Sequence, residues 1–236
     1  MPAHDNNSPS PRILPLGDQA LTVEFGDSID LRINRSVLAF AAHVERSHLT
    51  GVQEIVPTYR SATVYFDPFA ITGENLALAL RALLARPLTE SSQNGTTHSI
   101  PVLYGGSAGP DLEEVAHTAK LTSEQVIELH CSHVYHVYML GFSPGFPYLG
   151  TLPPSLVMPR LATPRKQVAA GSVGLAGGQT GIYPQQSPGG WRIIGCTPVR
   201  LFSMTRARPF LLQAGDQVRF VPVGEKEFQD LSEESH

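Results

Sequence analysis

Apolar and polar residues in the first third of the chain follow two different periods. Residues 21–25 (LTVEF) alternate between apolar and polar, which is typical of a half-buried strand. A helix capped by Asp30 follows, with apolar residues three and four positions apart. Its apolar stripe consists of Ile33, Val37, Phe40, Ala41 and Val44. Two more strands, over 52–56 and 62–66, and a helix capped by Thr72 complete the order strand, helix, strand, strand, helix, which predicts a ferredoxin-like α+β domain.

The remainder of the chain predicts a different architecture. A strand over residues 100–104 precedes two short helices, which begin near Asp111 and at the capping box formed by Thr122 and Gln125. Beyond Tyr135, short apolar runs alternate with closely spaced glycine and proline, a pattern that favours a small β-barrel. The fold class is therefore α+β, with an α+β domain followed by a barrel. The boundaries are an N-terminal domain at 12–88, a polar linker at 89–97, a barrel domain at 98–224 and a polar tail at 225–236.

Composition restricts the class of protein. The chain has 236 residues, of which 42% are apolar and 16% charged, values typical of globular proteins. We find no run of about eighteen apolar residues and no apolar segment resembling a signal peptide near the N-terminus, so we expect a cytoplasmic protein without a membrane span. The two cysteines, Cys131 and Cys196, are too few for a disulfide framework and are expected to be reduced thiols.

The charge is unevenly distributed along the chain. Residues 131–215 contain no Asp or Glu but seven Lys and Arg, while the rest of the chain has 10 cations against 21 anions. This asymmetry indicates an anionic ligand or partner surface for the basic stretch. The alternative is that these arginines pair with acids from elsewhere in the fold. Nucleic acid is a poor candidate partner, because the basic residues are dispersed among glycine and proline.

Residues 141–145 (GFSPG) match the G-x-S-x-G motif of serine hydrolases, yet a nucleophile is not expected here. In that motif the residue after the serine donates its backbone N–H to the oxyanion. The residue after Ser143 is Pro144, which has no N–H, and the only later histidine is His236 at the C-terminus. Ser143 is therefore interpreted as a turn residue.

Two other kinds of site are also disfavoured by the sequence. His130, His133 and His136 lie where helix changes to strand, so their side chains are not expected to converge on a metal ion. A phosphate-binding Walker loop is excluded because none of the three lysines closes the required motif.

The glycine-rich run 171–181 (GSVGLAGGQTG) could present backbone N–H groups to an anion, with Gln179 and Thr180 as ligand contacts. Alternatively, its glycines only provide the positive φ angles of tight turns.

Three long blocks of this sequence resemble the signature blocks of the 5-oxoprolinase B-subunit family. They are residues 135–150 (YHVYMLGFSPGFPYLG), 163–184 (TPRKQVAAGSVGLAGGQTGIYP) and 187–198 (SPGGWRIIGCTP). The same family is called allophanate hydrolase subunit 1 and includes a sporulation kinase inhibitor. This chain departs from the family pattern at Cys196, where an arginine is usual, and at Ala169, where a proline is common.

The resemblance implies a cyclophilin-like barrel and a function within a complex. Members of the family act with a second barrel protein, the C subunit, and with a hydrolase, the A subunit, to open 5-oxoproline to glutamate using ATP. The implied cofactor is ATP, at a site that cannot be assigned to this chain. Related barrels occur in urea carboxylase, and one family member inhibits a sensor histidine kinase, so both activities remain alternatives. A prolyl isomerase role follows only from the fold, which does not determine function.

A candidate binding site follows from these blocks. Arginines can hold the carboxylate of a substrate or a phosphate, and aromatic rings can form the wall of the site. The expected substrate-binding residues are Arg160, Arg165, Gln179, Thr180, Tyr183, Trp191, Phe142, Phe146 and Tyr148. Core packing of the aromatic residues is the alternative. Catalytic residues are not assigned, because residues 131–215 contain no carboxylate to act as a general base.

Overall fold

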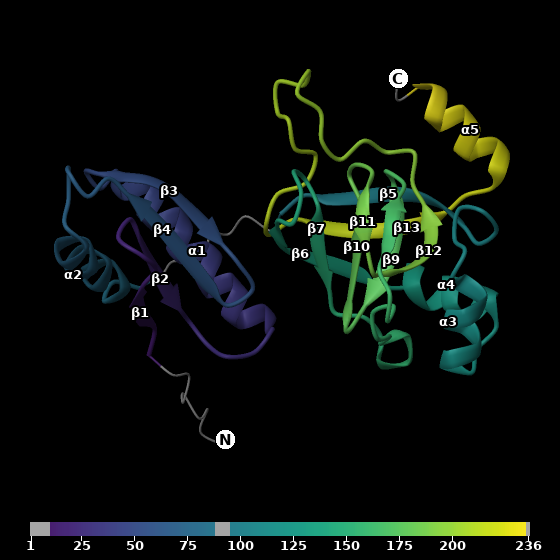
Figure 1. Ribbon diagram of the computed structural model, residues 1–236, viewed down its shortest axis with the longest axis horizontal. Coiled ribbons are helices and arrows are strands. Elements are labelled where there is room, and N and C mark those ends of the chain that lie inside the picture. The colour runs from purple at the N-terminus through teal and green to yellow at the C-terminus, as the bar shows by residue number, and fades with distance from the viewer. Residues whose placement is uncertain (1–9, 88–94, 235–236) are drawn as a thin grey trace. The chain divides into compact units, whose positions relative to one another are not determined.

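A computed structural model describes residues 10–87 and 95–234 of the chain (Figure 1). The chain divides into two compact units, residues 1–94 and residues 95–236. The linker expected at 89–97 falls mostly outside the described residues. In the part of the chain that is described, no helix combines the length and apolar character needed to cross a membrane.

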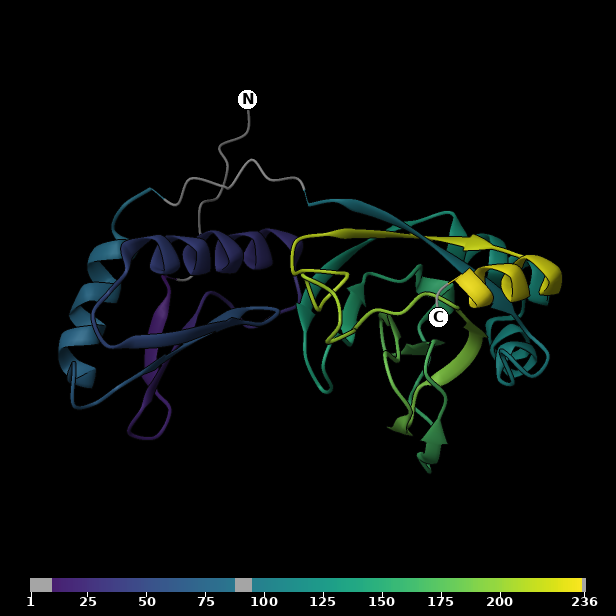
Figure 2. The same ribbon diagram turned by 90° about the horizontal axis from the view of Figure 1, so that it is seen from above.

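The first unit is a four-stranded antiparallel sheet with two helices. Its strands have the order β1-β2-β4-β3, and the sheet's core contains residues from both helices. Figure 2 shows α1 lying along one face of the sheet. The elements are β1 (Arg12–Pro15), β2 (Ala20–Glu24), α1 (Leu31–Ser47), β3 (Val52–Pro57), β4 (Ser61–Phe66) and α2 (Gly73–Leu84).

The predicted α+β order of this unit is confirmed, with one additional strand. β1 forms a hairpin with β2, so that Arg12 lies opposite Glu24 at the edge of the sheet. Both expected caps are present: the Asp30 side chain accepts hydrogen bonds from the amides of Arg32 and Ile33, and the Thr72 side chain accepts one from Asn75. These bonds satisfy amides that have no partner within the helix and so define where α1 and α2 begin.

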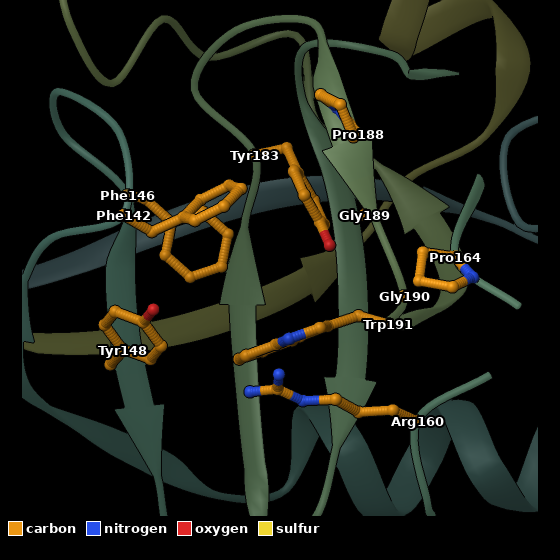
Figure 3. A pocket seen from close by; sticks show the side chains of 10 residues that line it. All are labelled: Phe142, Phe146, Tyr148, Arg160, Pro164, Tyr183, Pro188, Gly189, Gly190 and Trp191. Carbon is orange, nitrogen blue, oxygen red and sulfur yellow. The ribbon is translucent and has the colours of Figure 1, made fainter. Parts of the chain in front are cut away.

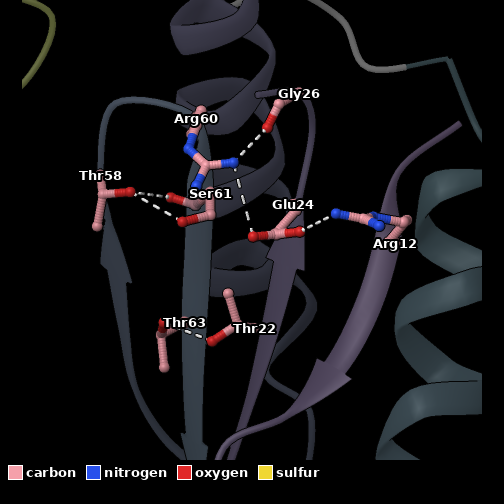
Figure 4. A network of polar contacts seen from close by, with 8 residues as sticks. All are labelled: Arg12, Thr22, Glu24, Gly26, Thr58, Arg60, Ser61 and Thr63. Carbon is pink, nitrogen blue, oxygen red and sulfur yellow. Dashed lines mark hydrogen bonds and ion pairs between the residues drawn. The ribbon is translucent and has the colours of Figure 1, made fainter. Parts of the chain in front are cut away.

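The face of the sheet opposite its apolar core is polar (Figure 4). Glu24 lies 2.7 Å from Arg12 and 3.7 Å from Arg60, whose guanidinium also donates to the Gly26 carbonyl. The hydroxyls of Thr22 and Thr63 form a cross-strand hydrogen bond of 3.0 Å. The alternation along β2 and β4 thus separates an apolar face that packs on the helices from a hydrogen-bonded polar face.

The second unit is a closed barrel of seven strands in the order β10-β7-β6-β13-β5-β12-β9. β13 and β5 pair in parallel, and the other neighbours are antiparallel. A two-stranded sheet of β8 and β11 accompanies the barrel. The strands are β5 (Thr97–Tyr104), β6 (Val134–Leu140), β7 (Pro147–Gly150), β8 (Arg165–Val168), β9 (Ser172–Ala176), β10 (Gln179–Ile182), β11 (Ser187–Gly189), β12 (Arg192–Cys196) and β13 (Gln217–Pro222). The predicted barrel is confirmed.

Two helices connect β5 to β6, a short 3₁₀ helix lies between β7 and β8, and one helix follows β13. They are α3 (Leu112–Ala119), α4 (Ser123–Cys131), the short 3₁₀ helix η1 (Pro154–Leu156) and α5 (Glu225–Glu234). The expected capping box at the start of α4 is present, because Thr122 and Gln125 each accept a hydrogen bond from the other's amide. The segment expected to be a polar tail forms α5 over most of its length.

Candidate functional site

Aromatic residues from separate segments of the barrel surround one cavity of about 240 Å³ (Figure 3). A cavity of this size suits a small ligand. The lining residues are Phe142, Phe146, Tyr148, Arg160, Pro164, Tyr183, Pro188, Gly189, Gly190 and Trp191. Six of the nine predicted site residues therefore lie together, while Arg165, Gln179 and Thr180 lie outside the lining.

Phe146 is the centre of the aromatic cluster. Its ring centroid lies 5.0 Å from Tyr148, 5.2 Å from Tyr183, 5.4 Å from Trp191 and 5.5 Å from Phe142. All four pairs meet edge to face, the arrangement that aromatic quadrupoles favour. Phe146 is buried, whereas Phe142 is 64% exposed. The aromatic wall thus extends from the barrel interior to solvent at Phe142.

Glycines allow these rings to approach the strands. A Cβ on Gly181 would lie 3.0 Å from the Trp191 ring, 3.1 Å from the Phe146 ring and 2.9 Å from the Pro147 carbonyl oxygen. A Cβ on Gly189 would collide with the Tyr183 hydroxyl. At these two positions a side chain would occupy the space that the aromatic wall requires.

Arg160 is the one cation in the lining, which contains no carboxylate. It lies between η1 and β8, and Figure 3 shows its guanidinium turned toward the aromatic side chains. In the described ranges, Arg160 forms no ion pair with a carboxylate. The cavity therefore carries a positive charge that its own lining does not neutralise, which favours an anionic ligand.

The two tyrosines of the cavity act as neutral phenols at neutral pH. Burial raises the pKa of Tyr148 and Tyr183, although the positive charge of Arg160 opposes this shift at both residues. For Tyr183, a hydrogen bond with the Trp191 backbone also opposes it. The lining has no histidine, carboxylate, lysine or cysteine. Its groups can bind and orient a ligand, but none of them can act as a general base near pH 7.

Arg165 is absent from the cavity lining and has a carboxylate partner. Its Nη2 is 2.6 Å from Oδ1 of Asp111, whose side chain is almost completely buried. The Asp111 Oδ2 accepts a hydrogen bond of 2.6 Å from the Ile193 amide, and Arg165 donates a long one, 3.5 Å, to the Trp191 carbonyl. Arg165 therefore holds the Trp191 segment through Asp111, and its contact with a ligand stays a prediction.

A second ion pair from α3 supports the segment that carries Arg160. Arg192 lies 2.6 Å from Glu114, and its Nε donates to the Pro159 carbonyl at 3.1 Å. The Leu161 amide donates to the Gly190 carbonyl at 2.8 Å. The residues on both sides of Arg160 are thus fixed to the start of β12. No local pattern indicates that Asp111 and Glu114 pair with these arginines, because the acids lie about 50 to 80 residues before them in the chain.

Gln179 and Thr180 begin β10 rather than lining the cavity. The Thr180 side chain is fully buried, donates a hydrogen bond to the Gly174 carbonyl and lies 3.0 Å from Nε2 of His130. Two glycines of the predicted anion nest, Gly171 and Gly177, have positive φ angles of 83° and 56°. Tight turns and anion-binding nests both use positive φ angles of this kind.

Ser143 and the histidines show no catalytic arrangement. The Ser143 Oγ is buried and has no hydrogen-bond partner among the residues described. His130 is fully buried at the end of α4, and His133 is exposed. In the described part of the chain, no three His, Cys, Asp or Glu residues are grouped so that they could hold a metal ion.

Pairing with acids from elsewhere in the fold explains part of the basic stretch. Arg165 and Arg192 pair with acids of the α3 region. The other five cations form no ion pair within the described residues; they are Arg160, Lys166, Arg200, Arg206 and Arg208.

This chain is similar to known proteins and to a solved structure over most of its length. The family model described as carboxyltransferase domain, subdomain C and D, matches residues 11–212. The 5-oxoprolinase B subunit of Bacillus subtilis (strain 168) is 41% identical over 235 residues, which cover 95% of this chain and 98% of that protein. The 5-oxoprolinase B subunit of Escherichia coli O157:H7 is 42% identical over 88% of this chain and 94% of that protein. The crystal structure of TTHA0988 is 38% identical, with a TM-score of 0.79 over 87% of this chain. This chain spans only 40% of that structure's chain.

Proposed function

Because the chain belongs to the 5-oxoprolinase B-subunit family, we propose that it works as the B subunit of an ATP-dependent 5-oxoprolinase. In this reaction the lactam C–N bond of 5-oxo-L-proline is broken, water adds to the carbonyl carbon, and L-glutamate forms while ATP is hydrolysed. A five-membered lactam is an unstrained amide, so the reaction requires an activating step such as phosphorylation of the carbonyl oxygen.

The observation that carries this proposal is the single unneutralised guanidinium of Arg160 in an aromatic cavity. 5-Oxoproline combines a small flat ring with one carboxylate. We place the carboxylate at Arg160 and the ring against the aromatic wall around Phe146. The hydroxyls of Tyr148 and Tyr183 lie in the same cavity as phenols able to donate hydrogen bonds to the ligand.

The composition of the cavity lining also indicates which chemical groups a partner protein must provide. It has no general base, so the cavity binds and orients the lactam while the base and the ATP site come from other subunits. These are the proposed partners, a barrel protein like the family's C subunit and a hydrolase like its A subunit. The isolated chain is accordingly expected to have neither 5-oxoprolinase nor ATPase activity.

Reconstitution tests the proposal. The chain is mixed with the two purified partners, and ATP hydrolysis dependent on 5-oxoproline is measured together with glutamate formation. Arg160→Gln should raise KM for 5-oxoproline about ten- to a hundredfold, the loss expected for one charge-assisted contact. Lys166→Gln is the matched control, because Lys166 is an exposed cation of the same stretch outside the cavity lining.

Three results would overturn the proposal. Robust turnover by the isolated chain would show that it needs no partner. Activity with urea or allophanate in place of 5-oxoproline would assign the cavity to another amide. Inhibition of a sensor histidine kinase, with no lactam-dependent ATP hydrolysis in the reconstituted mixture, would identify a regulatory protein.

A further inference from the structure

A hairpin with unneutralised positive charge connects β12 to β13. We call residues 200–211 the basic hairpin. Its stem is held by hydrogen bonds from the Leu211 amide to the Leu201 carbonyl and from the Ser203 amide to the Pro209 carbonyl, both 2.9 Å. Leu201 is buried in the barrel core, whereas the intervening residues leave the strands as the yellow-green loop in Figure 1. The hairpin is thus a formed structure anchored on the barrel.

The exposed part of the basic hairpin combines cations with apolar side chains. Arg200, Arg206 and Arg208 are exposed and have no carboxylate partner in the described ranges. Between them, Met204 is 77% exposed, and the nearby Phe210 is 41% exposed. Met, Phe and Arg are enriched in the buried centres of protein–protein interfaces, where Lys, Asp and Glu are depleted.

The basic hairpin packs directly against the loop that forms the exposed edge of the cavity. The rings of Phe202 and Phe210 lie 5.1 Å apart, and a Cβ on Gly145 would lie 3.0 Å from Cβ of Phe202 and 3.6 Å from Phe210. Gly145 belongs to the same turn as Phe142, the exposed ring of the aromatic wall. A molecule seated on the basic hairpin would therefore lie next to the cavity.

We propose that the basic hairpin is the docking surface for an acidic protein surface on one of the partner proteins, with an apolar centre that covers Met204 and Phe210. The inference rests on the proposed function, in which the cavity requires a base from another chain. The basic hairpin has no anion to pair with its arginines, and the adjacent cavity has no carboxylate to act as a base. Carboxylates from another chain would meet both needs. A partner rich in Asp and Glu at this point supplies both, and a partner without them supplies neither.

The test measures binding of the full chain to each purified partner protein at low and high salt. Arg200→Gln/Arg208→Gln removes two charges whose side chains form no hydrogen bond among the described residues, and it leaves intact the 2.8 Å bond from Arg206 to the Arg200 carbonyl. We expect this variant to bind one partner about tenfold more weakly at low salt, with a smaller difference at about 0.5 M salt. Met204→Ser should weaken the same complex at both salt concentrations.

The matched control is Arg81→Gln/Arg86→Gln, which removes two exposed arginines from the other compact unit. It should bind the partner as the wild type does. Unchanged binding by the Arg200/Arg208 variant, or equal weakening by the control, would overturn the docking proposal. So would loss of binding to double-stranded DNA or to phosphatidylglycerol vesicles while partner binding is unchanged, because this would assign the hairpin to a different class of polyanion.

The docking proposal and the proposed function can each fail without the other. Direct binding of 5-oxoproline to the isolated chain depends on Arg160 and should not change in the hairpin variants. If partner binding depends on Arg200 and Arg208 but 5-oxoproline is neither bound nor hydrolysed, the docking surface stands and the proposed substrate fails. If 5-oxoproline binds normally and the hairpin variants assemble normally, the proposed substrate stands and the docking surface fails.

Discussion

The guanidinium of Arg165 lies 2.6 Å from the carboxylate of Asp111 and so links β8 to the N-terminus of α3. The other Asp111 oxygen accepts a hydrogen bond from the Ile193 amide. This single buried carboxylate therefore joins the start of α3 to β8 and to β12, where Ile193 lies two residues after Trp191 of the cavity lining. A cation that the charge pattern alone would assign to a ligand is here paired with a buried carboxylate.

Replacing Arg165 and Arg160 by alanine should produce opposite results. Arg165→Ala leaves the buried Asp111 without its charged partner, so we expect the free energy of unfolding to fall by about 1.5–3 kcal/mol. Arg160→Ala removes an exposed side chain with no ion pair in the described ranges, so stability should change little while 5-oxoproline binding weakens. Chemical unfolding and ligand titration on the same preparations check both expectations.

Asp111→Asn is the companion variant for this pair. It should reproduce the stability loss of Arg165→Ala, and the double variant should lose less than the sum of the two single variants because the residues interact. Additive losses would show that the ion pair contributes no coupling. A large loss of ligand affinity in Arg165→Ala with unchanged stability would return Arg165 to the binding site.

The fold was predictable from sequence to the extent that short-range patterns determine it. The α1 and α2 caps and the alternation in β2 and β4 are local, and they predicted the α+β unit correctly. β1 was missed because it is four residues long and ends in Pro15, so that only its pairing with β2 identifies it. The barrel was predicted from many short apolar runs between turns, although this pattern contains no information on strand order.

The candidate site was predictable only in part, for a physical reason. Aromatic residues and Arg160 stood out because of their type, and six of them do line one cavity. Whether an arginine faces a ligand or a carboxylate depends on contacts between distant parts of the chain, as with Arg192 and Glu114. Thr180 shows the same limit: its glycine neighbours indicated space for a ligand, but the barrel closes around its side chain.

Gly181→Ala should reduce ligand binding by crowding the cavity. The added methyl carbon would lie 3.0 Å from the Trp191 ring, 3.1 Å from the Phe146 ring and 2.9 Å from the Pro147 carbonyl oxygen, in each case closer than van der Waals contact. We expect a stability loss of about 1–3 kcal/mol together with weaker 5-oxoproline binding. Gly178→Ala is the matched control, since a Cβ on Gly178 meets no atom within 4 Å. Equal effects of the two substitutions would mean that backbone freedom, not space, explains the glycine at position 181.

Ser143→Ala should leave the reconstituted activity within a few-fold of the wild type. The Ser143 Oγ is buried without a hydrogen-bond partner in the described residues, so its removal should be neutral or slightly stabilising. An activated nucleophile would instead lose several orders of magnitude in kcat. Steady-state kinetics and a thermal unfolding curve decide between them, and a collapse in kcat with an unchanged melting temperature would reinstate the hydrolase motif.

A buried histidine connects the barrel strands through a directional set of hydrogen bonds. The Thr180 hydroxyl donates to the Gly174 carbonyl, so its oxygen must accept from Nε2–H of His130 at 3.0 Å. Nδ1 of His130 then accepts from the Tyr104 hydroxyl at 2.7 Å. The ring also stacks on Phe220, with centroids 4.4 Å apart. Protonation would place an N–H at Nδ1 as well, and the Tyr104 hydroxyl would then have to turn from donor to acceptor.

This arrangement predicts a specific dependence of stability on pH. Burial, assisted by the nearby His133, lowers the pKa of His130 from 6.5 to about 3. Below pH 6.5 the unfolded chain binds a proton at this residue that the folded chain does not, so stability is complete above pH 6.5 and falls as pH decreases toward 3. The His130 contribution should be about 2 kcal/mol between pH 6.5 and 5, at about 1.4 kcal/mol per pH unit. His130→Gln removes the titrating group, so the difference in unfolding free energy between wild type and variant should shrink by that amount over the same range. Should the variant not fold, the NMR titration of the His130 ring in the wild type provides the same test, and protonation near pH 6 in the folded protein would contradict the prediction.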